Sequence, residues 1–336
     1  MAELRDRLDI TVEELEESLG QIKLPRFIDE SEKLFLSRID TICEEICSDT
    51  NKKAIFVSGP TSSGKTTFTL RLSEALTAHG RKGYHLSLDD YYCLNELTFD
   101  RDGRPDFETI DALDIDRAAN DIKAILAGER VVPPFFDFKI RQQMEGDPAN
   151  AIEMDSNGVL VVEGLHGLSK RISGAIPDEA CAKVFIMPYG NVFCDSKLMD
   201  STEIRLLRRI VRDYRHRAAH ALATIDYWPM ITKSEEKYYT DYLTAADYHI
   251  NSFLAYESLI IAPMALHDID EAMEQAMNGT IAPSVFMEKS NTGKPFADLS
   301  SALAKAAKLQ AHLHKIPVVI PSQVPAESIL NEFIGA

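Results

Sequence analysis

The chain has 336 residues, of which 45% are hydrophobic and 26% charged, a composition typical of a folded globular protein with a full core. Its 53 acidic and 36 basic residues give a formal net charge of −17, which excludes a broad nucleic-acid-binding surface because such a surface needs clustered Lys and Arg. The apolar stretch 259–266 is too short for a membrane span and contains a proline. From the charge and from this stretch we expect no nucleic-acid partner and no membrane partner.

Residues 1–50 are predicted to form an acidic, helical N-terminal extension. Phe35, Ile39 and Ile42 recur at the spacing of one helix face. We expect this face to pack against the domain that follows, and we assign the extension no chemistry.

The stretch from Gly59 to Thr66 fits the phosphate-loop pattern G-x-x-x-x-G-K-[ST]. An apolar run before it predicts a buried strand, and residues 67–76 after it predict a helix, which is the context that the pattern requires. The backbone N–H groups of such a loop bind phosphates, its lysine neutralises the β/γ oxygens, and its final hydroxyl ligates Mg²⁺. The sequence therefore predicts a nucleoside triphosphate site made by Gly59, Pro60, Thr61, Ser62, Ser63, Gly64, Lys65, Thr66 and Thr67.

Residues 51–252 are predicted to form one α/β domain, because strand patterns alternate with helical ones, which indicates a parallel sheet with helices on its faces. The polar stretch 100–106 follows the second predicted strand, and insertions at the carboxyl edge of such a sheet usually build a substrate site. The predicted strands are 54–58, 84–88, 159–163, 183–187 and 248–250.

Two carboxylates are predicted to lie at this carboxyl edge. Asp89 follows the second strand, where a carboxylate can accept the proton of an attacking hydroxyl and can lie near a metal. Asp90 is the alternative base, and a pair of aspartates that only caps a turn is the structural alternative. Glu163 ends the third strand, and a buried carboxylate there is costly unless it is paired or holds Mg²⁺. His166 is interpreted as a hydrogen-bonding residue rather than a catalyst.

Six arginines occur in the thirteen residues 205–217. Four of them would share one face of a helix whose other face is apolar. Because like charges repel unless anions lie between them, and because arginine binds phosphate oxygens in pairs, the cluster predicts a phosphate-binding face. A solvated helix with surface ion pairs is the alternative. The four arginines are Arg205, Arg208, Arg209 and Arg212.

Residues 253–336 are predicted to form a C-terminal extension. The sequence predicts an acidic amphipathic helix at 268–277, a loop at 284–296 and an alanine-rich helix at 302–313.

The five cysteines form no C-x-x-C pair and are odd in number, which favours reduced thiols and a cytoplasmic protein over a disulfide framework or a zinc site.

In this order, the motifs resemble those of the uridine kinase/phosphoribulokinase family, and most closely those of the bacterial uridine kinase-like nucleoside kinases. The resemblance rests on the phosphate loop, on 86–89 and 162–164, and on the arginine helix, over about residues 53–258. The stretches 106–114, 163–168 and 328–335 support the subgroup. The resemblance implies a P-loop NTPase fold of the α/β class, with a parallel five-stranded sheet, helices on both faces and an arginine-bearing lid.

The resemblance also implies the roles of residues in phosphoryl transfer. Asp89 would be the base, and Mg²⁺ would be held by Thr66 with Asp89 and Glu163 close by. Phosphate contacts are implied for Lys65, Arg212 and Arg217.

The acceptor pocket departs from that of pyrimidine nucleoside kinases. Glu108, Phe136 and Arg141 stand at positions where those enzymes have Asp, Tyr and His, and Ala219 replaces one lid arginine of the animal enzymes. A phenylalanine cannot donate the hydroxyl hydrogen bond, and an arginine prefers an acceptor or an anion. We expect the acceptor to be bound by Asp89, Tyr91 or Tyr92, Glu108, Phe136, Phe138, Arg141 and Arg209.

The sequence therefore predicts a kinase that moves the γ-phosphoryl group of Mg²⁺-bound ATP to a hydroxyl of a small acceptor, with a uridine- or cytidine-like nucleoside favoured. A sugar phosphate or other anionic metabolite is the first alternative, supported by Arg104 and Arg141. A nucleotide-sensing regulatory protein of low turnover is the second alternative, although it is disfavoured by an intact catalytic set: Lys65, Thr66, Asp89 and Glu163. We expect the chain to form a homo-oligomer.

Overall fold

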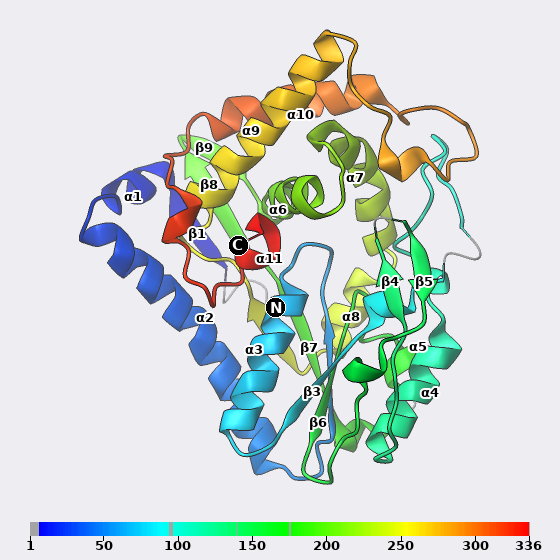
Figure 1. Cartoon of the computed structure of the whole chain (residues 1–336). Coiled ribbons are helices and arrows are strands. Elements are labelled where there is room, and N and C mark those ends of the chain that lie inside the picture. Colours follow the sequence, from blue (N-terminus) through cyan, green and yellow to red (C-terminus); the bar gives the residue numbers. More distant parts are fainter. Residues whose placement is uncertain (1–6, 94–96, 139, 175, 336) are drawn as a thin grey trace.

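The computed structural model describes residues 7–93, 97–138, 140–174 and 176–335 (Figure 1). At its centre lies a five-stranded sheet in the order β10-β7-β2-β6-β3, with every pair of neighbours parallel. The predicted parallel sheet is confirmed, and the predicted bounds of its strands are met to within two residues. The strands are β2 (Ala54–Ser58), β3 (Gly83–Ser87), β6 (Val159–Glu163), β7 (Cys181–Met187) and β10 (Tyr248–Asn251).

Helices cover both faces of this sheet, as the fully buried apolar strands β2 and β6 require. In β2, Ile55 and Val57 pack into the larger core, whereas Ala54 and Phe56 pack into the smaller one. The larger core includes α2 (Lys23–Ser48), α3 (Lys65–Ala78), α6 (Ser201–His216), α7 (Ala221–Glu235), α9 (Ser258–Met277) and α10 (Leu299–Leu313). The smaller core includes α4 (Ile115–Leu126), α5 (Lys170–Ser173) and α8 (Tyr239–Ala245).

The N-terminal extension is helical only in part. The predicted apolar face of α2, with Phe35, Ile39 and Ile42, is buried in the larger core. However, β1 (Leu8–Thr11) pairs in parallel with β8 (Gly190–Cys194), which in turn pairs with β9 (Ser196–Met199) in a separate three-stranded sheet. The prediction missed β1 because a strand of four residues, with one of them buried, has no alternating pattern to detect. A short helix, α1 (Val12–Glu17), follows β1.

The C-terminal extension packs onto the predicted lid helix. The helix predicted at 268–277 begins already at Ser258, as α9, and contains Pro263 near its start. Contacts of α6 with α7, α9 and the short α11 (Asn331–Ile334) enclose α6, as Figure 1 shows near the C-terminus. The domain boundary at residue 252 stays a prediction. Of the helices described, none is long and apolar enough to cross a membrane.

Candidate active site

The phosphate loop joins the end of β2 to the start of α3. Gly64 has the left-handed φ of 88° that favours glycine, and a Cβ on Gly59 would lie 2.1 Å from the carbonyl oxygen of Ile186. Within the described residues, the buried hydroxyls of Ser62 and Ser63 have no hydrogen-bond partner. The Lys65 ammonium donates to backbone carbonyls of the loop itself, at 3.0 and 3.2 Å. This geometry leaves loop donors available for an anionic ligand.

Beside the loop, Glu163 at the end of β6 offers a free carboxylate oxygen. Its Oε1 accepts hydrogen bonds from Ser87 at 2.9 Å and Thr66 at 3.3 Å, whereas its buried Oε2 has no partner among the residues described. Burial, and then the nearby charge of Asp89, raise the pKa of the Glu163 carboxyl to about 8. A cation would reverse this shift, since it would stabilise the charged form.

These residues fit Mg²⁺ in the setting of a phosphate loop. The hydroxyl of Thr66 and the carboxylates of Glu163 and Asp89 are the hard oxygen donors that Mg²⁺ prefers, and phosphate and water oxygens fill its other positions in phosphate-loop enzymes. Within the described part of the chain, no cluster of three or more His, Cys, Asp or Glu side chains could hold a metal ion.

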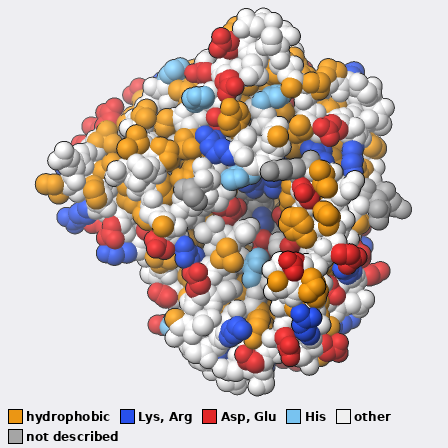
Figure 2. All heavy atoms as spheres, in the orientation of Figure 1, with side chains coloured by type: hydrophobic (Ala, Val, Ile, Leu, Met, Phe, Trp, Pro, Cys, Tyr) orange, Lys and Arg blue, Asp and Glu red, His pale blue; other side chains and the backbone are white. Residues whose placement is uncertain are grey.

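One cavity of about 340 Å³ joins the phosphate loop to the predicted acceptor residues. Figure 2 shows a hollow near the middle of one face, with basic and acidic side chains together at its wall. Two of the aromatic residues in its wall, Phe136 and Phe138, come from a hairpin that sequence analysis missed, made by β4 (Phe135–Asp137) and β5 (Gln142–Met144). Predicted residues that line the cavity are Thr61, Ser62, Lys65, Thr66, Asp89, Glu108, Phe136, Phe138, Arg141, Arg209, Arg212 and Arg217.

The structure excludes Tyr91 from this cavity and places Tyr92 there instead. Tyr91 lies in a short 3₁₀ helix, Leu88–Tyr91, which turns its side chain into the smaller core. There it is fully buried, and its hydroxyl donates to Asp121 Oδ2 at 2.8 Å. Tyr92 contacts the rings of Phe136 and Phe138, with centroids 5.5 and 6.1 Å apart. The prediction of Tyr91 as an acceptor contact is therefore wrong, and its alternative, Tyr92, lines the cavity.

The protein's own carboxylates neutralise most of the arginine face of α6. Arg205 Nη1 lies 2.9 Å from both carboxylate oxygens of Glu235, and Arg208 is fully buried in an ion pair with Glu257. The prediction that these two arginines face a phosphate is wrong, and so is the alternative of surface ion pairs. The carboxylates that separate the like charges come from α7 and from the residue before α9.

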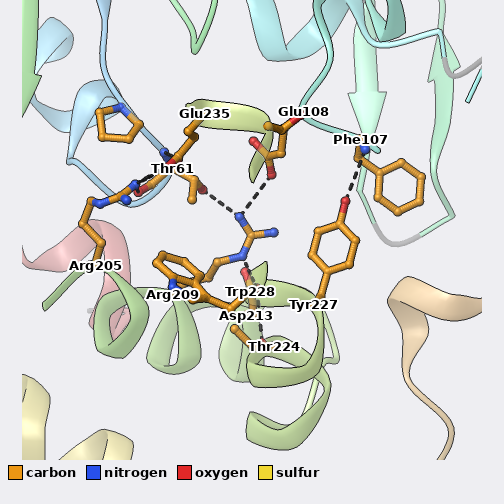
Figure 3. Close-up of polar contacts among 12 residues, drawn as sticks. Thr61, Phe107, Glu108, Arg205, Arg209, Asp213, Thr224, Tyr227, Trp228 and Glu235 are labelled. Atoms are coloured by element: carbon orange, nitrogen blue, oxygen red, sulfur yellow. Dashed lines mark hydrogen bonds and ion pairs between the residues drawn. The ribbon is translucent and has the colours of Figure 1, made fainter. Parts of the chain in front are cut away.

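Arg209 remains at the cavity but is also paired. Its Nε lies 3.0 Å from Asp213 Oδ2, and its Nη1 lies 3.3 Å from Glu108 Oε1 and 2.8 Å from Thr61 Oγ1 (Figure 3). Arg209 therefore joins α6 to the phosphate loop and to the acceptor wall at Glu108.

Arg212 and Arg217 share the single carboxylate of Asp213, at 3.4 and 3.6 Å, and both line the cavity. The guanidinium of Arg217 also lies over the ring of Phe138, 4.5 Å from its centroid. Burial, and then the neighbouring charge of Arg212, lower the pKa of Arg217 to about 10. Two cations that share one carboxylate can still attract an anion such as a transferring phosphoryl group.

Sequence analysis missed Phe107, Leu165 and Ala218 of the cavity wall, and it missed two parts of the site that come from the C-terminal extension. Val285, Phe286 and Glu288 line the acceptor end of the cavity, and Glu332 lines the end at the phosphate loop. Nothing in the local sequence of 284–296 signals this contact, because it depends on how the segment packs on α7. For Glu332 a signal existed, since the stretch 328–335 stood out as a motif without a role.

Comparison with known proteins identifies the family. The sequence model of the "Phosphoribulokinase / Uridine kinase family" matches residues 54–255, more than half of the chain. The chain belongs to this family. Its members are kinases, and the matched residues contain the phosphate loop, both edge carboxylates and the arginines of α6. No curated protein matches the chain.

Solved structures resemble the chain at low identity. A possible uridine kinase from Bacillus stearothermophilus has 16% identity and a TM-score of 0.42, over 64% of this chain and 97% of that one. A candidate fructose transport system kinase from Silicibacter has 16% identity and a TM-score of 0.41, over 63% and 98% of the two chains. The protein YGR205w has 14% identity and a TM-score of 0.31, over 47% and 69%.

Proposed function

We propose that this family member transfers the γ-phosphoryl group of ATP to a hydroxyl of a small acceptor, with a nucleoside as the favoured acceptor. One observation carries the proposal: Lys65 and Thr66 of the phosphate loop line the same cavity as Asp89 and the aromatic acceptor wall. A donor phosphate and an acceptor hydroxyl could therefore meet without water between them.

Each residue of the cavity supports one part of this chemistry. Asp89 would accept the proton of the acceptor hydroxyl as that oxygen attacks phosphorus. Lys65, Arg212 and Arg217 would stabilise the charge on the transferring phosphoryl group. Mg²⁺, held by Thr66 and the free oxygen of Glu163, would neutralise the phosphate oxygens.

The flat ring of a nucleoside fits the aromatic wall. Phe136 and Phe138 contact each other edge to face, with centroids 5.0 Å apart, and both line the cavity. Glu108 lines the same cavity, and its carboxylate, which accepts from Arg209, could also accept hydrogen bonds from ribose hydroxyls.

The test is phosphoryl transfer from labelled Mg-ATP by the purified full-length chain, screened against nucleosides, sugar phosphates and aromatic acids. Transfer is expected with the unaltered chain and with the control Lys315→Ala, which removes an exposed lysine remote from the cavity. No transfer is expected with Lys65→Ala, because the β/γ charge loses its neutralising group. The proposal would be refuted if Lys65→Ala transferred phosphoryl groups as well as the unaltered chain does. It would also be refuted if the unaltered chain transferred none to any acceptor.

A further inference from the structure

Unusual backbone conformations are concentrated at the cavity. Four described residues other than glycine have a left-handed φ, and three of them, Ser62, Arg141 and Ala218, line the cavity. Arg141 has a φ of 53°, a conformation that an arginine rarely adopts and that persists only where the surroundings enforce it. Such strain at a cavity suggests that the position of the Arg141 side chain matters to a ligand.

The Arg141 guanidinium lies against aromatic rings and has no ion-pair partner among the described residues. It lies over Phe107 and Phe286, 4.9 and 5.4 Å from their centroids. Its Nη1 is buried without a hydrogen-bond partner, and Arg141 forms no ion pair within the described residues. Burial lowers the pKa of this guanidinium, and the charge of Glu288 opposes that shift only in part. An oxygen acceptor brought by a ligand would remove the cost of the unpaired N–H.

Phe286 is a fixed platform for this arginine. It stacks on Tyr227 of α7, with centroids 4.7 Å apart and planes 16° from parallel. Tyr227 is itself anchored, since its hydroxyl donates to the carbonyl of Pro105 at 2.7 Å. The same hydroxyl accepts from the N–H of Phe107 at 3.2 Å, the contact that Figure 3 shows. The segment Val285–Met287, which had no assigned role, therefore helps to place the Arg141 guanidinium at the cavity.

Most of the other charges near Arg141 are paired with each other, and the remaining one, Glu288, forms no ion pair with Arg141 among the described residues. Glu108 pairs with Arg209, and Asp213 pairs with Arg209, Arg212 and Arg217. Glu288 lines the cavity but is exposed to solvent. Arg141 is thus a cation whose buried N–H points to an anionic oxygen from outside the chain.

We propose that Arg141, supported by Phe286, selects an acceptor whose flat ring carries an anionic oxygen group, of which a carboxylate is the simplest form. The inference rests on the proposed function, because it concerns the acceptor end of the same cavity. The rings of Tyr92, Phe136 and Phe138 supply a surface for a flat ring, and Arg141 supplies the contact to the anion.

The test uses two probes that differ by one carboxylate: orotate and uracil. Binding of each to the full chain is measured by calorimetry with a saturating non-hydrolysable Mg-ATP analogue. Orotate should bind about 10- to 100-fold more tightly than uracil, the range expected for a hydrogen bond between charged groups. Equal affinity of the unaltered chain for the two probes would overturn the proposal.

Three variants locate the effect. Arg141→Met should remove the preference for orotate, and Phe286→Ala should reduce it, because the guanidinium loses its platform. Arg26→Met is the matched control: it removes the same charge from a side chain of α2 that is 79% exposed and does not line the cavity, and it should keep the full preference. If Arg141→Met still prefers orotate to uracil, the role proposed for Arg141 is wrong. If Phe286→Ala keeps the full preference for orotate, the role proposed for Phe286 is wrong.

The outcome can be separated from that of the kinase proposal. Orotate preference without phosphoryl transfer to any acceptor would contradict the kinase proposal alone. Phosphoryl transfer without orotate preference would contradict the selection by Arg141 alone. Thermal unfolding of each variant shows whether a lost preference reflects lost folding.

Discussion

Arg208 of α6 and Glu257 form a buried ion pair, with Nη2 2.6 Å from Oε2 and both side chains almost inaccessible to solvent. Arg208 also donates from Nη1 to the Ser62 carbonyl at 3.3 Å and lies over the ring of Phe333, 5.0 Å from its centroid. One arginine therefore connects the phosphate loop, the start of α9 and the C-terminal helix. The pair thus adds a polar link between the kinase core and residues after 252, whose apolar side chains are buried in the larger core.

Arg208→Met should destabilise the chain by about 3–5 kcal/mol, because it leaves the Glu257 carboxylate buried without its partner. The double variant Arg208→Met, Glu257→Gln should recover part of this loss. Urea unfolding measures both. Arg26→Ala, which breaks an exposed pair with Glu30, is the control and should leave the urea midpoint unchanged. Equal effects of Arg208→Met and Arg26→Ala would show that the buried pair adds nothing.

Asp89→Asn should reduce turnover by roughly 10²–10⁴ while keeping most of the affinity for Mg-ATP, since a positioned base contributes about that factor. Asp90→Asn is the informative comparison, because Asp90 Oδ1 accepts a hydrogen bond from the Phe136 N–H at 3.3 Å and supports the hairpin. Asp90→Asn should therefore alter the KM for the acceptor more than kcat. Near-normal kcat in Asp89→Asn with a large loss in Asp90→Asn would transfer the role of base to Asp90.

Local sequence was sufficient for the sheet and the phosphate loop, because a buried parallel strand is a continuous apolar run and the loop has its own pattern. It also placed Asp89 and Glu163 at the carboxyl edge, since this position follows from where a strand ends. It failed for Arg205 and Arg208, because their partners, Glu235 and Glu257, lie 30 and 49 residues further along the chain.

The choice between Tyr91 and Tyr92 was also beyond local sequence. Both follow the same strand, and only the 3₁₀ turn from Leu88 to Tyr91 decides which ring enters the cavity. The wall at Phe286 depends in the same way on a contact between segments far apart in the chain, its stacking on Tyr227.

His166 should make stability depend on pH. It is buried, its Nε2 lies 2.9 Å from the Glu108 carbonyl, which can only accept, and its Nδ1 lies 2.9 Å from the Tyr242 hydroxyl. Burial, partly opposed by the hydrogen bond to Glu108, lowers the pKa of His166 from 6.5 to about 4. Between these values the unfolded chain binds a proton that the folded chain does not, so stability falls as the pH decreases through this range.

This difference in pKa predicts a loss of about 3 kcal/mol from His166 between pH 6.5 and pH 4. His166→Gln keeps a polar side chain that does not titrate, so it should flatten this part of the profile. The measurement is urea unfolding of both proteins at pH 7.5, 6 and 5. Parallel profiles for the two proteins would show that His166 is not the group responsible.

The C-terminal segment meets the phosphate loop directly. Ile329, Leu330 and Phe333 are fully buried, and a Cβ on Gly64 would lie 2.3 Å from the Ile329 side chain. From this anchored segment, Glu332 Oε2 accepts a hydrogen bond from the Thr67 N–H at 3.1 Å, in the first turn of α3. That turn is where a phosphate loop offers its N–H groups to a nucleotide.

Glu332→Gln should therefore tighten Mg-ATP binding by about 3- to 30-fold, because a carboxylate at a helix N-terminus contributes roughly 0.6–2 kcal/mol and would repel the incoming phosphates. Calorimetric titration of the full chain measures the change. Glu327→Gln is the matched control, since this carboxylate is exposed on the same segment and its contact with Arg71 uses the backbone carbonyl. Weaker binding of Mg-ATP by Glu332→Gln would instead make Glu332 a ligand of the nucleotide complex. Unchanged binding would mean that the Glu332 carboxylate leaves the Thr67 N–H without a loss of free energy when the nucleotide binds.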